Sequence, residues 1–198
     1  MIDAVIFDLG NVLAFHDNEL LFRELSRLFK GDVRARLEGS GTWERVNKGF
    51  LKGDALRREL VARLGAEVSR EDFERAWSCH FTLNPPMIRN VEALVGHVKL
   101  ALLSNTHDLH VAHLRPLIPV LEKFDALILS CEVGAMKPEE VIYRRAVEAL
   151  KVEPPRAVFF DDMEPYVRAA EQLGLHARVF RSADEVSGQL AQLGLMRS

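Results

Sequence analysis

Five short apolar segments constrain the fold of this 198-residue chain more than any other feature. Their apolar residues are continuous rather than alternating, which is typical of strands buried on both faces of a parallel sheet. Helical patterns at 86–96, 138–150, 165–173 and 182–193 lie between or after the later segments. Strands that alternate with helices predict an α/β fold with helices on both faces of the sheet. The segments are DAVIFD at 3–8, VKLALLS at 98–104, ALILS at 126–130, AVFFD at 157–161 and ARVF at 177–180.

The interval between the first two segments is unusually long, at about ninety residues. It shows amphipathic helical patterns at 18–30, 54–64 and 69–81 and no good strand. A crossover between parallel strands needs only about a dozen residues. We therefore predict an all-helical insertion at 17–85, ending at the Pro85-Pro86 pair, in a core domain formed by 1–16 and 86–198.

Composition excludes several classes of protein. The chain has 26 basic and 29 acidic residues, so a net charge of −3 gives no general attraction to nucleic acid or anionic membranes. Acidic residues interrupt the apolar N-terminus and no basic residue precedes it, unlike a signal peptide, and no apolar run approaches the length of a membrane span. Two cysteines exclude a disulfide framework and fit a reducing cytoplasm.

Polar side chains follow the predicted strands at the points where the strands end. Asp8, Ser104 and the Asp161-Asp162 pair close three strands, and Lys137 lies between the third and fourth. In an open α/β sheet, the carboxyl ends of the strands form the ligand site. Each residue alone also fits a helix cap or a solvated surface. Together, carboxylates, a hydroxyl and an ammonium group suit a Mg²⁺ ion and a phosphate.

Four ordered motifs now point to a family. They are Phe7-Asp8-Leu9-Gly10-Asn11-Val12, Leu103-Ser104-Asn105-Thr106, Gly134-Ala135-Met136-Lys137-Pro138 and Phe159-Phe160-Asp161-Asp162. Over essentially its whole length the sequence resembles the haloacid dehalogenase (HAD) superfamily of phosphohydrolases. It is similar within it to bacterial α-D-glucose-1-phosphate phosphatase-like proteins and to the N-terminal phosphatase domain of epoxide hydrolases. The resemblance implies a Rossmann-like core and identifies the insertion as a C1 cap.

The resemblance also implies a role for each motif residue. Asp8 would be the nucleophile that forms an aspartyl-phosphate, and Lys137 would neutralise charge on Asp8 and on the phosphoryl group. Ser104 and Asn105 would bind that group. Mg²⁺ would be held by Asp8, the Gly10 carbonyl and Asp162, with Asp161 beside it. The implied activity is Mg²⁺-dependent hydrolysis of a small phosphorylated metabolite, such as a sugar phosphate, by a monomer or homodimer.

Two positions depart from the family pattern. A second aspartate usually acts as general acid and base where this chain has Gly10, and relatives often have asparagine where it has Tyr166. His16 or Asp17, which are a few residues downstream, could replace the missing carboxylate or could simply cap a helix. These departures leave two alternatives open. One is a weak or inactive protein that binds a phosphorylated ligand or a protein, and the other is a phosphotransferase.

The insertion and the second motif add a few further expectations. Arg45 or Lys48 could contact an anionic substrate or lie on a solvated helix face, and Trp43 is expected in the core of the insertion. His107, His110 and His113 are spaced by three, so a third histidine would leave the shared helix face. We predict that they are surface histidines rather than a zinc site.

Overall fold

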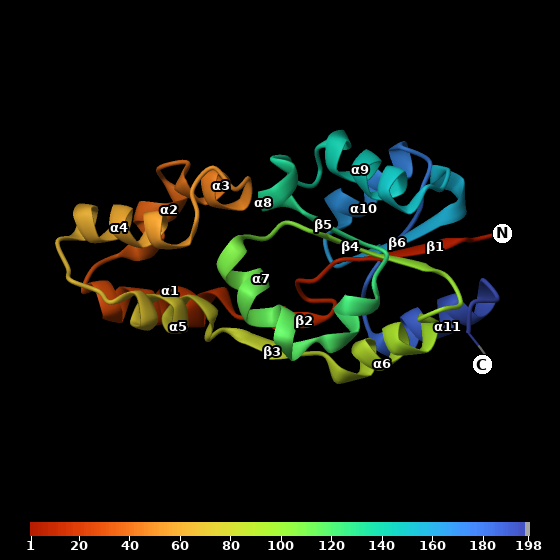
Figure 1. Ribbon diagram of the computed structural model, residues 1–198, viewed down its shortest axis with the longest axis horizontal. Coiled ribbons are helices and arrows are strands. Elements are labelled where there is room, and N and C mark those ends of the chain that lie inside the picture. The colour runs from red at the N-terminus through yellow and green to blue at the C-terminus, as the bar shows by residue number, and fades with distance from the viewer. Residues whose placement is uncertain (197–198) are drawn as a thin grey trace.

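A computed structural model describes residues 1–196 of the chain (Figure 1). Its centre is a five-stranded sheet in the order β5-β4-β1-β6-β7, and every neighbouring pair is parallel. This confirms the predicted α/β fold. The strands are β1 (Ala4–Phe7), β4 (Lys99–Ser104), β5 (Ala126–Leu129), β6 (Ala157–Asp161) and β7 (His176–Val179).

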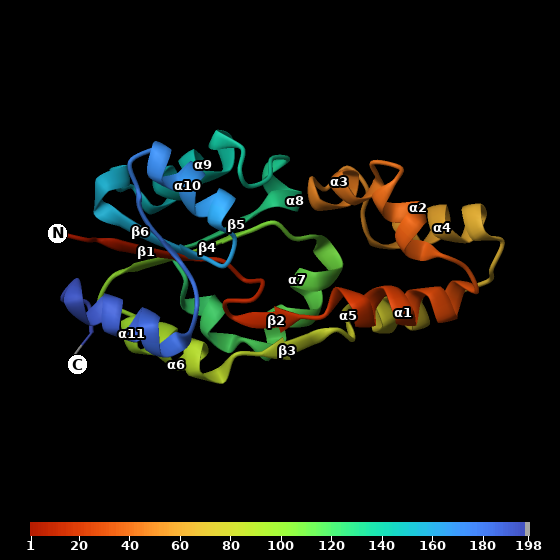
Figure 2. The same ribbon diagram turned by 180° about the vertical axis from the view of Figure 1, so that it is seen from behind.

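Both faces of the sheet are covered, which explains why its strands are continuously apolar. Along β1, Val5 and Phe7 belong to one apolar cluster, whereas Ala4 and Ile6 belong to the cluster on the other face. Figures 1 and 2 show α6 (Pro85–Leu94) and α11 (Ala183–Gln192) on the first face, and α9 (Glu140–Leu150) and α10 (Glu164–Gln172) on the second. The helix predicted from Pro138 begins two residues later, at Glu140.

The insertion projects beyond the carboxyl end of the sheet (Figure 2). Its helices enclose an apolar cluster of their own, which includes Leu25, Phe73 and Trp77. Two six-residue helices were not predicted, because each is too short to show a helical period. The helices are α1 (Asn18–Phe29), α2 (Val33–Glu38), α3 (Thr42–Asn47), α4 (Gly53–Leu64) and α5 (Arg70–Ser78).

A short antiparallel ribbon joins this insertion to the core. It pairs β2 (Ala14–His16) with β3 (Phe81–Leu83), so the segment 17–85 is not entirely helical and the helix predicted to reach residue 81 ends at Ser78. Three-residue strands leave too short a pattern to detect, and their pairing partner lies far away in the sequence.

The remaining elements lie between β4 and β6. They are α7 (Asp108–Leu114), the 3₁₀ segments η1 (Arg115–Leu117) and η2 (Pro119–Lys123), α8 (Ser130–Val133), and η3 (Pro154–Arg156). Among the described residues, no helix is both long enough and apolar enough to span a membrane.

Candidate active site

The carboxyl ends of the central strands open into a cavity of about 280 Å³. Asp8 follows β1, Ser104 ends β4, and Asp162 follows β6, so three neighbouring strands deliver polar groups to one place. Asn105 and Lys137 also line the cavity. The structure therefore brings the motif residues together, with Asp161 buried directly behind them.

A buried lysine links two of the carboxylates. Lys137 is 2% exposed, and its Nζ lies 2.9 Å from Asp8 Oδ1 and 2.5 Å from Asp161 Oδ2. Burial lowers the pKa of Lys137, but the charges of both carboxylates outweigh it and raise the pKa overall. Burial raises the pKa of Asp161 to about 6, although the charge of Lys137 acts to lower it. The ammonium group thus stays protonated beside Asp8 at neutral pH.

Reciprocal hydrogen bonds fix the loops that carry Asn105 and Lys137. The Asn105 amide nitrogen donates to the Lys137 carbonyl over 2.9 Å, and the Lys137 backbone nitrogen donates to the Asn105 amide oxygen over 2.7 Å. Tyr166 lies over the same lysine, with its ring centroid 5.2 Å from Nζ. The tyrosine that departs from the family pattern therefore supports Lys137 from the cavity side.

Three carboxylates meet the requirements of a divalent cation. Asp8, Asp161 and Asp162 each offer an oxygen within 4.8 Å of the others. Asp162 is oriented by the Asn11 side chain, which donates to its Oδ2 over 2.8 Å, and Asp161 Oδ1 accepts from the Met163 backbone nitrogen over 2.8 Å. Because Asp161 is fully buried and is bonded to Lys137, Asp8 and Asp162 are the better placed ligands for hydrated Mg²⁺.

His16 occupies the space beside Gly10. A Cβ atom at Gly10 would lie 3.4 Å from His16 Cδ2 and 3.5 Å from its Nε2. The ring therefore fills the volume in which a longer side chain at position 10 would begin. His16 lines the cavity, whereas the Asp17 carboxylate caps α1 by accepting from the Leu20 backbone nitrogen.

The opposite wall of the cavity comes from the insertion and from α7. Trp43, Asn47, His80 and Phe81 line it, and no motif in the sequence marks them. Trp43 is half-buried: it packs against the apolar cluster of the insertion, as expected, and it also lines this wall.

The basic residues considered for substrate binding lie outside the cavity. Arg45 pairs with Glu59, and Lys48 pairs with Glu44 and with Glu139 of the core.

The prediction of surface histidines is wrong for two of the three residues. His107 and His110 are 1% and 9% exposed, and Trp77 Nε1 donates to His107 Nε2 over 2.8 Å. Burial lowers the pKa of His107 to about 3 and the pKa of His110 well below its usual value. Docking of the insertion on α7 covers them, and residue spacing does not reveal such a long-range contact. His113 is half-buried.

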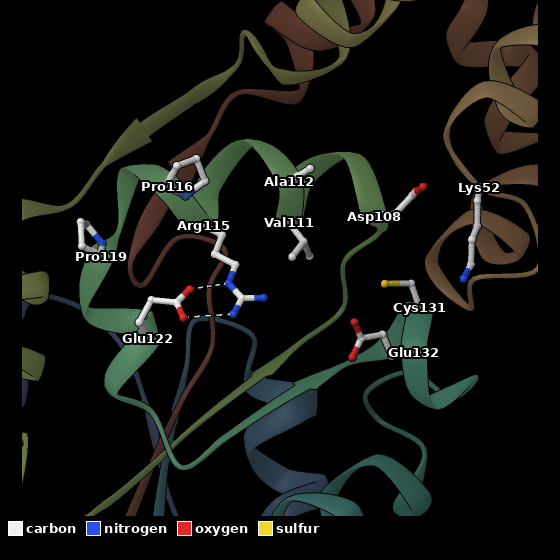
Figure 3. A pocket seen from close by; sticks show the side chains of 10 residues that line it. All are labelled: Lys52, Asp108, Val111, Ala112, Arg115, Pro116, Pro119, Glu122, Cys131 and Glu132. Atoms are coloured by element: carbon white, nitrogen blue, oxygen red, sulfur yellow. Dashed lines mark hydrogen bonds and ion pairs between the residues drawn. The ribbon is translucent and has the colours of Figure 1, made fainter.

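A more open cavity of about 590 Å³ lies outside this site (Figure 3). It is lined by α7, α8 and the loop before α4, with Lys52, Asp108 and Glu132 at its edge. The bidentate pair between Arg115 and Glu122 closes one side. None of the motif residues lines this cavity, so the smaller one is the candidate active site.

Comparison with known proteins identifies the family of this chain. Residues 2–174 match the haloacid dehalogenase-like hydrolases. The chain belongs to this family. A HAD family enzyme from Bacteroides thetaiotaomicron, solved with magnesium and inorganic phosphate, superimposes with a TM-score of 0.84 and 23% identity, covering 92% of this chain and 96% of that one. This likeness confirms the fold.

Two curated relatives span most of this HAD-like hydrolase. D-ribitol-5-phosphate phosphatase of Bacteroides thetaiotaomicron is 26% identical over 186 residues, which are 88% of this chain and 89% of that protein. Phosphorylated carbohydrates phosphatase of Thermotoga maritima is 26% identical over 182 residues, which are 87% and 82% of the two chains. The predicted membership in the HAD superfamily is thus confirmed, and both relatives are named as phosphatases.

Proposed function

We propose that this HAD-like hydrolase is a Mg²⁺-dependent phosphomonoesterase that cleaves small phosphorylated metabolites, such as sugar phosphates. One observation carries the proposal. The Asp8 carboxylate lines the cavity while Lys137 contacts one of its oxygens, and a second acidic group, Asp162, lies within ligand distance. This arrangement combines a nucleophile with fixed positive charge, which is what phosphoryl transfer requires.

The chain's own residues account for the main steps. Ser104 and Asn105 bind and orient the phosphoryl group, and Lys137 offsets its negative charge. An Asp8 oxygen forms a bond to phosphorus while the ester P–O bond breaks, and the leaving alkoxide takes up a proton. Water then attacks the phosphorus of the aspartyl-phosphate and gives a proton to the group that protonated the alkoxide, while the bond between Asp8 and phosphorus breaks. Inorganic phosphate leaves and Asp8 is regenerated. Of the two residues considered as proton donor, His16 lines the cavity and we assign it this position.

The acidic cluster fits Mg²⁺. Asp8, Asp162 and the Gly10 carbonyl would hold the ion, with Asp161 beside them, and when bound it would supply positive charge near the phosphoryl oxygens. Two proteins similar to this chain support the rest of the proposal. One is the HAD family enzyme that was solved with magnesium and inorganic phosphate, and the other is D-ribitol-5-phosphate phosphatase, which is named for a polyol phosphate.

We further propose that the chain is divided into a core of 1–16 and 86–198 and a cap of 17–85. The separate apolar cluster within the insertion and the ribbon of β2 and β3 at its base support this division.

The test is release of phosphate from acetyl phosphate and a panel of sugar phosphates, with MgCl₂ or with EDTA. We expect turnover with Mg²⁺, and a loss of at least about 10³-fold in Asp8→Asn, because the nucleophile is removed. Asp184→Asn, at the exposed first turn of α11, is the matched control and should retain full activity. Undiminished activity in Asp8→Asn, or none in the unmodified protein, would refute the proposal.

A further inference from the structure

Formal charge is divided unevenly within the active-site cavity. Asp8, Lys137 and Asp162 are its only Lys, Arg, Asp or Glu side chains among the described residues. Asp8 and Asp162 follow β1 and β6, and Lys137, from the loop after α8, lies against Asp8. The opposite wall consists of amide, imidazole and aromatic groups. We call this the neutral wall and define it as Asn18, Trp43, Asn47, His80, Phe81 and His110.

Charged residues next to the neutral wall are held away from the cavity. Asp17, adjacent to Asn18 in sequence, caps α1 with its carboxylate. Lys48, adjacent to Asn47, has its Nζ 2.9 Å from Glu44 and 3.2 Å from Glu139. Neither Asp17 nor Lys48 therefore offers the wall a free charge that could pair with an ionised group of a ligand.

The buried histidines of the wall add no charge at neutral pH. Burial, together with the neighbouring His16, lowers the pKa of His80 to about 4. Burial and the neighbouring histidines likewise lower the pKa of His110, whose Nε2 lies 3.3 Å from the Trp77 carbonyl. Both rings are therefore neutral hydrogen-bonding groups near pH 7.

Asn47 is rigid and offers an unused acceptor. It is 5% exposed, its amide nitrogen donates to the Trp43 carbonyl over 2.9 Å, and its backbone carbonyl lies 2.6 Å from the Ser130 hydroxyl. Within residues 1–196 its amide oxygen has no hydrogen-bond partner. An acceptor of this kind suits a ligand hydroxyl, and the Trp43 and Phe81 rings that line the same cavity suit the C–H faces of a carbon chain.

We infer that the neutral wall selects phosphomonoesters whose leaving group is small, uncharged and hydroxylated, and that it rejects those with a second ionised group. This inference rests on the proposed function and specifies the substrate class. An ionised group placed against the buried part of the wall would lose hydration without gaining a counter-ion, which is costly. A hydroxyl in the same place would exchange its water for Asn47 or a histidine at little cost.

Matched substrate pairs test the inference. Glycerol 3-phosphate is compared with 3-phosphoglycerate, and glucose 6-phosphate with 6-phosphogluconate, because each pair replaces a neutral end with a carboxylate. We expect kcat/KM to be at least about 100-fold higher for the uncharged member of each pair. Acetyl phosphate, which is too small to reach far along the wall, serves as the reference substrate for chemistry at Asp8.

A variant should shift this preference. Asn18 is an exposed member of the neutral wall, and Asn18→Lys supplies the missing counter-ion for a carboxylate. We expect the ratio of kcat/KM for 3-phosphoglycerate to that for glycerol 3-phosphate to rise about tenfold or more. Gln172→Lys adds the same charge at the exposed end of α10 and should leave the ratio unchanged.

The outcomes separate the inference from the proposed function. If acetyl phosphate is cleaved but both members of each pair react within threefold of each other, the selection by the neutral wall is wrong and the phosphatase activity stands. Cleavage of acetyl phosphate alone, with neither uncharged ester accepted, also overturns the inference. Failure of all substrates, acetyl phosphate included, refutes the proposed function and the inference with it.

Discussion

Replacing Lys137 by methionine is the sharpest test of how the active site is held together. The ammonium group is buried between Asp8 and Asp161, which are 7% and 0% exposed. Methionine preserves most of the side-chain volume but leaves two carboxylates facing each other without a counter-ion. Removal of one partner from a buried ion pair typically costs about 3–5 kcal/mol of unfolding free energy. For a protein of this size we expect a fall in Tm of about 10 °C at pH 7 in EDTA.

At lower pH, the free energy of unfolding of Lys137→Met should come closer to that of the unmodified protein. Burial raises the pKa of Asp161 above its value in the unfolded chain, and loss of Lys137 removes the main influence that lowers it. The folded variant therefore takes up a proton more readily than its unfolded chain as pH falls from 7. The loss of unfolding free energy is therefore largest at pH values above the pKa of Asp161 in the folded variant, and it declines as pH falls through that pKa. Urea unfolding at pH 7 and pH 5 measures both free energies.

Two further measurements make this prediction refutable. MgCl₂ should restore part of the lost stability, because a cation at Asp8 and Asp162 replaces some of the missing charge. Lys123→Met, at an exposed position, should change the unfolding free energy by less than about 0.5 kcal/mol. A loss below about 1 kcal/mol for Lys137→Met at pH 7 would show that the carboxylates do not depend on the lysine.

Three other predictions concern the insertion, its contacts with the core, and His16. A Cβ at Gly49 would lie 1.9 Å from the Cys131 carbonyl oxygen, whereas Gly41 also has a positive φ but open space around it. Gly49→Ala should therefore destabilise the protein by at least about 2 kcal/mol more than Gly41→Ala, as measured by thermal unfolding of both variants. Burial lowers the pKa of His107 to about 3, against 6.5 in the unfolded chain, so its contribution to stability is complete above pH 6.5 and is lost as pH falls. Between pH 7 and pH 5, the unfolding free energy measured in urea should therefore fall by about 2 kcal/mol less in His107→Gln than in the unmodified protein. His16→Asn should lower kcat by about 10²-fold or more with a smaller change in KM, whereas steady-state kinetics with unchanged kcat would place the proton donor elsewhere.

The sheet could be predicted from the sequence because its physical cause is local. A strand covered on both faces must be apolar at every position, and β1, with all four residues buried, shows this directly. The ribbon of β2 and β3 could not be predicted in the same way. Its three-residue strands are partly exposed, and they are stabilised by a partner almost seventy residues away.

In the candidate site, too, the features with a local cause could be predicted and those that depend on distant contacts could not. Asp8, Ser104 and Asp162 could be expected to meet because the ends of parallel strands meet at one edge. The burial of His107 and His110 depends on Trp77, which reaches them from the other side of the cap–core contact. Nothing in the spacing of the histidines indicates that a tryptophan covers them.

One core residue connects the two halves of the site. The Ser130 hydroxyl accepts from the Thr106 backbone nitrogen over 2.9 Å, in the loop that follows Ser104. The same oxygen lies 2.9 Å from the Thr106 carbonyl and 2.6 Å from the Asn47 carbonyl, one of which receives its single proton. The Asn47 end of the neutral wall is therefore set against the loop that follows Ser104 through one buried hydroxyl. Because Ser130 contacts both, the spacing between Asn47 and the loop after Ser104 is set by the core as well as by the helices of the insertion.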